Sequence, residues 1–317
     1  ASGRNWSKAC RRISCILPVS IMNSAGRAGP VAVVAHDAGG AAFLASYVEQ
    51  EGLDALFVLA GPAEQIFRHQ FNGEIHTVSL SVALAACDWV LTGTGWQTDF
   101  EWQAIRQGRA AGKYVATFLD HWVNYPMRFV KNSMACYPDE IWVGDEYAAE
   151  IARKTLPKLA IRKIDNPYFS YFISEMRRMG NAADTQRGHG KNILFVSENI
   201  NRDGFHQDDA IRYFLSNLDS LEIEVGQILI RPHPSELADK YSWVAVEFGG
   251  VVRISDGASL EEEMALSDIV VGCTSMAMAL AVFAGRRVIS CIPDEKISLT
   301  LPFSQIEQLS ALIKQNK

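Results

Sequence analysis

The sequence predicts an α/β protein of two Rossmann-like domains, each a parallel β-sheet covered by helices on both faces, that face one another across a cleft. Three observations support this fold class. Short continuous apolar runs, typical of strands buried on both faces, alternate with helical stretches. The alternation lapses once and then resumes. At 317 residues, the chain also exceeds a typical single domain.

These observations divide the chain into four parts. We expect a basic extension at 1–29, a first Rossmann-like domain at 30–165, a linker at 166–190, and a second Rossmann-like domain at 191–317. The extension has five basic residues and no acid. It could contact a membrane surface, but an upstream extension before a start at Met22 is the better interpretation.

The first domain opens with the strand "VAVVAH" from Val31, followed by "DAGGAAFLASYVEQEG", a glycine turn and a helix that stops at Gly52. Further strands are expected at "ALFVLA", "WVLTGT", "KYVATFLD" and "EIWVGD", and a helix at "TDFEWQAIRQGRAAG". Polar and glycine-rich "TQRGHGKN" is typical of an exposed connector.

The second domain repeats the same alternation of strands and helices from Asn192. Strands are expected at "NILFVS", "VGQILIRPHP", "DIVVGCTS" and "RRVIS", and helices at "DDAIRYFLSNL", "LEEEMALS" and "MAMALAVFAG". Parallel strands joined by helices account for this order in both domains.

Composition excludes several classes of protein. A formal net charge of −6 argues against nucleic acid as the main partner. The six cysteines show neither zinc-site pairs nor the density of a disulfide scaffold, which favours a cytoplasmic protein, with the inner face of the membrane as a further location. The sequence contains no apolar run near the roughly 20 residues that span a bilayer. A nicotinamide cofactor is disfavoured because "HDAGGAAF" lacks the G-x-G-x-x-G turn.

Ligands of parallel sheets bind outside the carboxyl ends of the strands. This rule selects the candidate site residues, which we expect to point into one cleft. They are Asp37, Gly39, Gly40, Asp120, His121, Ser197, Glu198, Arg231, His233, Thr274 and Ser275.

Two segments of the second domain have their own physical logic. Pro232 and Pro234 hold the backbone around His233 extended, so an imidazole is presented at the tip of a strand. In "GCTS", Gly272 ends a strand and two hydroxyl residues precede an apolar helix, whose unpaired N–H groups favour a phosphate. Alone, each segment is as well explained by a turn or a helix cap; together they favour a phosphate site.

The "RPHP" segment, followed roughly forty residues later by "TS" at a helix start, resembles the His-Pro and Ser-Ser/Thr motifs of bacterial sialyltransferases and polysialyltransferases, which have the GT-B glycosyltransferase fold. Related motifs occur in 3-deoxy-octulosonate transferases of capsule assembly and in glycerophosphotransferases of teichoic-acid synthesis. The resemblance covers the second domain well and the first only in architecture. It implies that the domain at 30–165 binds the acceptor and the domain at 191–317 the nucleotide donor. It also implies that His233, Thr274 and Ser275 bind the phosphate of a cytidine nucleotide donor.

The resemblance implies a metal-independent inverting transfer of a sialic acid or related nonulosonate from a CMP-linked donor to a glycan acceptor, with no cofactor. The donor's nucleotide or phosphate is expected to contact Gly39, Gly40, Ser197, Glu198, Arg231, Pro234, Gly272, Thr274 and Ser275. The family's acidic base motif matches "HDAGG" only in part, since Ala38 replaces its second acid. Asp37 is therefore the first candidate for the general base, with Asp120 and His121 as the alternative.

Three other functions stay open at this point. A sugar-nucleotide 2-epimerase would share the two-domain architecture and the phosphate site. A CDP-linked glycerophosphotransferase would share the motifs. A non-catalytic nucleotide or sugar binding protein would bind the ligand and show no turnover.

Overall fold

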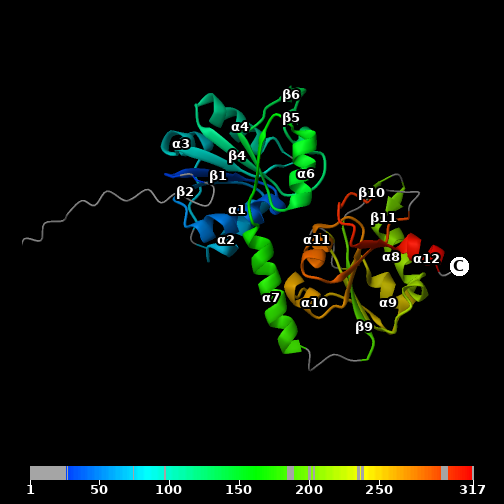
Figure 1. Ribbon diagram of the computed structural model, residues 1–317. Helices are drawn as coiled ribbons and strands as arrows, with labels where there is room; N and C mark the ends of the chain where they lie inside the picture. The colour runs from blue at the N-terminus through cyan, green and yellow to red at the C-terminus, as the bar shows by residue number, and fades with distance from the viewer. Residues whose placement is uncertain are drawn as a thin grey trace, which may run out of the picture.

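A computed structural model describes residues 26, 28–73, 75–95, 98–183, 189–198, 201–202, 204–233, 236, 239–293 and 299–315. Nearly all of the predicted extension at 1–29 therefore lies outside the described residues, as does Pro234. The remaining chain forms two α/β domains joined by a long helix (Figure 1).

The first domain contains a six-stranded sheet of order β2-β1-β3-β4-β7-β8, in which every neighbouring pair is parallel. Its strands are β1 (Val31–Ala35), β2 (Ala55–Leu59), β3 (Trp89–Thr92), β4 (Tyr114–Leu119), β7 (Glu140–Val143) and β8 (Ala160–Lys163). Its helices are α1 (Ala38–Glu51), α2 (Pro62–Gln70), α3 (Leu80–Ala86), α4 (Phe100–Ala110), α5 (Tyr125–Arg128) and α6 (Glu146–Thr155). A small antiparallel hairpin pairs β5 (Val130–Lys131) with β6 (Met134–Ala135).

The second domain repeats the design with the order β13-β12-β9-β14-β15-β16, again parallel throughout. Its strands are β9 (Lys191–Val196), β12 (Val225–Arg231), β13 (Val252–Ile254), β14 (Ile269–Gly272), β15 (Arg287–Ser290) and β16 (Ile306–Gln308). Its helices are α8 (Gln207–Leu215), α9 (Ser242–Phe248), α10 (Leu260–Ala265), α11 (Met276–Phe283) and α12 (Leu309–Gln315), with a 3-10 turn, η2, at Leu218–Leu221. A second hairpin pairs β10 (Asn201–Arg202) with β11 (Phe205–His206).

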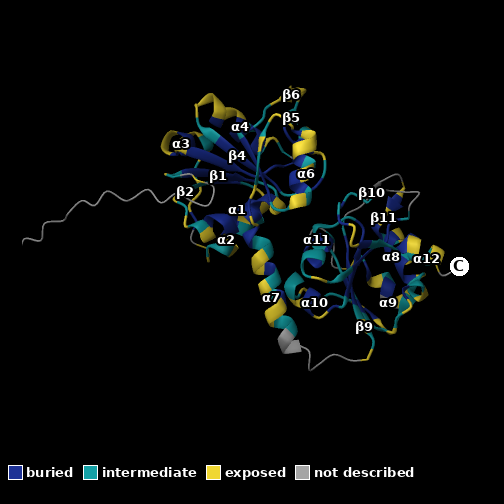
Figure 2. Ribbon diagram, in the orientation of Figure 1, coloured by how far each residue is buried: buried dark blue, intermediate teal, exposed yellow. Residues whose placement is uncertain are grey.

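These two sheets confirm the predicted fold class. The central strands are buried along their whole length, as at Val31–Ala35 and Ile269–Gly272, because helices cover both faces of each sheet (Figure 2). The predicted linker at 166–190 contains α7 (Pro167–Ala183), the helix that joins the domains (Figure 1).

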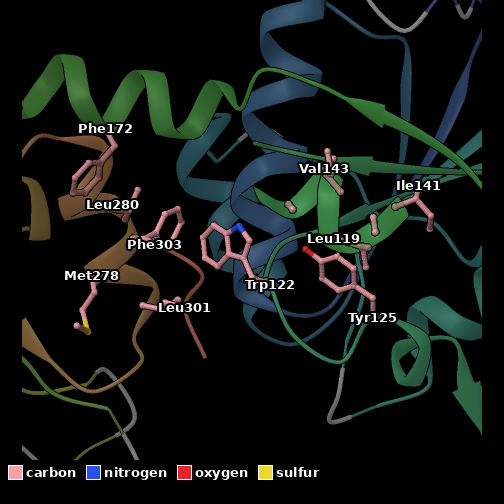
Figure 3. Packing of buried hydrophobic residues seen from close by; sticks show 14 of the residues in the cluster. Leu119, Trp122, Tyr125, Ile141, Val143, Phe172, Met278, Leu280, Leu301 and Phe303 are labelled. Atoms are coloured by element: carbon pink, nitrogen blue, oxygen red, sulfur yellow. The ribbon is translucent and has the colours of Figure 1, made fainter. Parts of the chain in front are cut away.

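One hydrophobic cluster continues from the first domain into the second. The ring of Trp122 lies 4.9 Å from that of Phe303, in an edge-on arrangement, and Tyr147 contacts the same phenylalanine at 5.1 Å (Figure 3). Phe169 of α7 packs on Phe283 of α11, also at 5.1 Å. The two domains are therefore held together by buried aromatic contacts as well as by the connecting helix.

Candidate functional site

A cleft of about 910 Å³ lies between the domains. The first domain contributes Gly39 from α1 and Asp120 from the carboxyl end of β4. The start of α7 contributes Asn166 and Phe169, and α11 contributes its first turn, including Met276. The volume is at the upper end of the range of about 300–1,000 Å³ that is typical of small-molecule sites. Of the residues that the strand-end rule selected, Gly39 and Asp120 are among those that line this cleft, whereas Asp37, His233, Thr274 and Ser275 are not.

Asp120 is held by a buried arginine. Arg128, whose side chain is 3% exposed, donates from Nη1 to Asp120 Oδ1 at 2.9 Å and to Thr94 Oγ1 at 2.7 Å. The short helix α5 begins after Asn124, which adopts a left-handed conformation, and carries the guanidinium back beneath the ends of β3 and β4. A buried charge requires such a partner.

Two glycines in the first turn of α1 make this packing possible. A Cβ atom on Gly39 would lie 2.2 Å from Asp120 Oδ2, so the carboxylate occupies the space of a side chain. A Cβ on Gly40 would lie 3.2 Å from the Cα of Gly93, where the turn after β1 meets the end of β3. The glycines predicted to allow a close approach to a ligand thus allow a close approach of Asp120 and of the neighbouring backbone.

Asp37 belongs to a second acidic group at the end of β1. Its Oδ1 lies 2.9 Å from His36 Nδ1, and both side chains are mostly buried. Glu101 Oε1 accepts hydrogen bonds from the backbone N–H of His36 at 2.7 Å and of Asp37 at 3.3 Å. The turn that carries Asp37 is therefore fastened to the first turn of α4.

Glu101 is itself 2% exposed, and burial raises the pKa of its carboxyl group. Within the part of the chain that the structure describes, its second oxygen, Oε2, has no hydrogen-bond partner. A Cβ placed on Gly95 would lie 2.9 Å from this oxygen and 3.2 Å from Asp37 Oδ2, so both carboxyl groups border the same glycine.

His121 follows Asp120 but faces a different environment. Its Nδ1 accepts a hydrogen bond from the N–H of Trp122 at 3.1 Å, which places the proton of the neutral ring on Nε2. Burial lowers the pKa of the imidazole, Asp120 acts against this and Arg128 adds to it. A neutral ring with its proton on Nε2 can donate a hydrogen bond from that nitrogen, but cannot accept a proton there.

In the second domain, Glu236 organises the His-Pro loop. Its Oε2 accepts from the backbone N–H of His233 at 2.9 Å and from Ser197 Oγ, and its Oε1 accepts from Tyr241 at 2.8 Å and Lys240 at 2.6 Å. Burial acts to raise the pKa of Glu236, but these hydrogen bonds outweigh it and the pKa is lowered. The side chain of Ser197 therefore supports the backbone of the exposed His233.

The Thr274 hydroxyl and the Ser275 hydroxyl have different partners. Glu198 accepts from the backbone N–H of Thr274 and, at 2.9 Å, from its Oγ1. Ser275 is the N-cap of α11 and accepts from the N–H of Ala277 at 3.2 Å. A Cβ on Gly272 would lie 2.9 Å from Val196 and 3.0 Å from Met278, so this glycine allows β14 and β9 to pack closely.

Arg231 is paired within its own domain. It donates to Glu263 Oε2 at 2.6 Å and to the carbonyl of Ala258 at 2.7 Å, and Glu263 is 3% exposed. This ion pair ties β12 to α10. The aromatic residues Trp102, Trp122 and Tyr125 of the first domain are buried in its core.

Sequence reasoning did not select Arg128, Glu101 or Glu236. Arg128 and Glu101 lie inside helices, and the strand-end rule considers only the residues that follow strands. Glu236 stands two residues after Pro234 in the segment that was singled out, and its acidic side chain next to a His-Pro pair was the available signal.

Two surveys of the described residues complete the site. No group of three or more His, Cys, Asp and Glu side chains among them is arranged to hold a metal ion. None of the helices within the described ranges has the length and apolar character needed to cross a bilayer.

Solved structures with the same architecture were found by comparison of folds. UDP-GlcNAc 2-epimerase from Methanocaldococcus jannaschii aligns over 90% of this chain and 91% of its own, with a TM-score of 0.60 and 11% identity. A glycosyltransferase from Rickettsia africae ESF-5 aligns over 82% and 78%, with a TM-score of 0.53 and 11% identity. The wall teichoic acid polymerase TagF, in a variant soaked with CDPG, aligns over 91% and 78%, with a TM-score of 0.50 and 12% identity.

No protein-family model matches the chain, and no curated protein matches its sequence. At these identities the solved structures establish the fold, which is the two-domain GT-B arrangement that the sequence predicted. They include glycosyltransferases and a sugar-nucleotide epimerase.

Proposed function

We propose that this chain is a glycosyltransferase that moves a sugar from a nucleotide-activated donor to a glycan acceptor. One observation carries the proposal: Asp120, from the carboxyl end of one parallel sheet, and the first turn of α11, from the other domain, line the same cleft. A carboxylate that is the alternative candidate for the base and a helix N-terminus that favours a phosphate thus meet across the space in which the two substrates would react.

The donor nucleotide binds to the second domain in this proposal. The N-terminus of α11 carries partial positive charge, and Thr274, Ser275 and His233 supply hydrogen-bond donors near it. Because Glu198 accepts from Thr274 in the structure, a phosphate on Thr274 would replace one anion by another. Following the motif resemblance, we propose a CMP-linked sialic acid or related nonulosonate as the donor.

The chemistry requires two tasks. The departing phosphate needs its developing negative charge stabilised, which α11 and His233 would do without a metal. The acceptor hydroxyl needs to lose its proton, which Asp37 would accept with His36 as its neighbour, on the face away from the nucleotide. Attack from that face inverts the anomeric centre.

The donor class is tested by thermal shift with CMP, CDP, UDP and GDP, because a bound nucleotide stabilises the folded state. His233→Ala should fold normally and lose about 1–3 kcal/mol of CMP affinity, the value of a charge-assisted hydrogen bond. His76→Ala, at an exposed histidine of the first domain, is the matched control. Unchanged affinity in His233→Ala would remove the phosphate role.

The base is tested by single-residue exchange. Asp37→Asn should retain nucleotide binding while transfer falls by about 10²–10⁴-fold. Near-parental transfer in that variant, with loss in Asp120→Asn or His121→Ala, would assign the base to the end of β4. Transfer should also persist in excess EDTA; loss on chelation that Mg²⁺ or Mn²⁺ restores would contradict the metal-free mechanism.

The products distinguish the other functions. A transferase releases free nucleotide in proportion to the new glycosidic bond. Interconversion of the donor without acceptor and without nucleotide release would identify an epimerase, and tight binding without turnover would identify a binding protein.

A further inference from the structure

The cleft continues past Asp120 along one side of α1. Gly39, Ala42 and Glu49 of this helix all line it, and ten residues of α-helix cover about 15 Å at 1.5 Å per residue. Helix α2 extends the same wall with Gln65, and α7 lies beside α1 (Figure 1). This elongated part of the cleft, from Gly39 to Glu49, is called the α1 groove below.

Aromatic side chains at the start of α7 form one wall of the groove. Tyr168, Phe169 and Tyr171 line it, and Tyr171 is 59% exposed. Asn166 fixes this turn, since its Oδ1 accepts from the backbone N–H of Tyr168 at 3.1 Å and of Phe169 at 3.3 Å. An exposed aromatic ring offers a flat apolar face, which suits the C–H face of a pyranose.

Uncharged polar groups stand along α2 and just after its end. Gln65, His69, Gln70 and Asn72 line the groove, and Gln70 donates to Glu49 across the two helices. Amide side chains both donate and accept hydrogen bonds, as sugar hydroxyls do. Aromatic faces and amides together match the surface of an oligosaccharide.

The charges of the groove select between kinds of oligosaccharide. Glu49, Asp120 and Glu261 bring carboxyl groups to the cleft, and none of its described lining residues is Lys or Arg. Burial raises the pKa of Tyr168 to about 12, with Glu261 contributing, so this phenol stays neutral at physiological pH. Asp120 is already paired with Arg128. The carboxylates of Glu49 and Glu261 face no Lys or Arg among the described lining residues, so they repel a polyanion.

We infer that the α1 groove binds an uncharged oligosaccharide acceptor, with its reacting end at Asp120 and further sugars on Tyr171 and along α1 and α2. That this ligand is the acceptor rests on the proposed function. That it is an uncharged oligosaccharide rests on the lining of the α1 groove alone. It excludes a polyanionic chain such as oligosialic acid as the preferred occupant.

Binding to the full chain is measured by isothermal titration at neutral pH without any donor. The probes are lacto-N-neotetraose, maltotetraose, cellotetraose and the disaccharide of each, against α2,8-linked tetrasialic acid. We expect a neutral tetrasaccharide to bind, more tightly than its own disaccharide and more tightly than tetrasialic acid. Tyr171→Ala should weaken that binding about two- to tenfold. Tyr213→Ala, on α8 of the other domain, should leave it unchanged.

Charge reversal gives a second, opposite readout. Glu49→Lys with Glu261→Lys should increase the affinity for tetrasialic acid, whereas Glu64→Lys, exposed on α2 outside the groove, should not. Binding of tetrasialic acid by the parent as tight as that of every neutral probe, absence of neutral binding, or indifference to Tyr171→Ala would each overturn the inference. Because no donor is present, a chain that binds neutral glycans but transfers nothing refutes only the proposed function. Transfer of the donor sugar to water with no glycan binding refutes only the groove.

Discussion

Replacing Arg128 by leucine would leave the carboxylate of Asp120 without its cation. The side chain of Asp120 is 13% exposed and that of Arg128 is 3% exposed, so water can reach little of the unpaired charge. The exchange also removes the donor to Thr94 Oγ1. Breaking a buried pair by removing one partner costs about 3–5 kcal/mol, and we expect Arg128→Leu to lower the free energy of unfolding by this amount.

The assay is urea unfolding at neutral pH, followed by far-UV circular dichroism. Arg153→Leu is the matched control, because Arg153 pairs with Glu146 at a similar distance of 2.8 Å but both side chains are about half exposed, at 54% and 55%. Solvent screens such a pair, so this variant should unfold with the parent.

A double exchange separates the charge from the packing. Asp120→Leu combined with Arg128→Leu removes both charges, and should be more stable than Arg128→Leu alone. The reasoning is refuted if Arg128→Leu is no less stable than Arg153→Leu, or if the losses of the two single variants simply add in the double variant.

Three further outcomes are expected. Gly39→Ala should lower both stability and transfer, because its Cβ displaces the Asp120 carboxylate. Gly180→Ala on α7, where a Cβ makes only an ordinary contact, should raise the free energy of unfolding in urea by about 0.5–1 kcal/mol. Equal effects of the two exchanges would contradict the packing argument. Burial lowers the folded-state pKa of His121, so the unfolded chain takes up the proton first and stability should fall as pH drops through about 6.5. Thermal unfolding should show a smaller loss of stability over this pH range in His121→Asn than in the parent. Burial raises the folded-state pKa of Glu101, so ionisation of this carboxyl group costs stability as pH rises above about 4.3. The stability of Glu101→Gln relative to the parent should therefore increase with pH in urea unfolding, and a difference that does not change with pH would remove the argument.

The sequence predicted the inner strands of both sheets because these strands are apolar on both faces. The strands it did not indicate, β8, β13 and β16, are only three or four residues long and lie at the sheet edges. In β8, the segment "AIRK" is half-exposed or exposed throughout, so its composition carries no signal of a buried strand. Edge strands are fixed by the neighbour they pair with, and a local pattern does not contain that neighbour.

The candidate site also has one part that the sequence predicted and another that it did not. Asp120 was selected because the ends of parallel strands share one edge of a sheet, and it lines the cleft. The same rule selected Thr274 and Ser275, but the residues of α11 that line the cleft are Met276, Ala277 and Leu280. The contacts that hold the site could not be predicted. Arg231 meets Glu263 across 32 positions of sequence, and Glu101 meets the His36 backbone across 65. Such pairs follow from the packing of helices onto the sheet, and no periodicity records them.

The aromatic contact between the domains limits how far this chain can be treated as modular. Trp122 is 5% exposed and Phe303 is 2% exposed, and their rings pack against one another across the two domains. A half-chain that ends within α7 would present one of these apolar faces to water, and would be prone to self-association. Exchange of the second domain for that of another protein therefore needs more than a matching α7: the incoming domain has to supply an aromatic partner where Phe303 meets Trp122 and Tyr147.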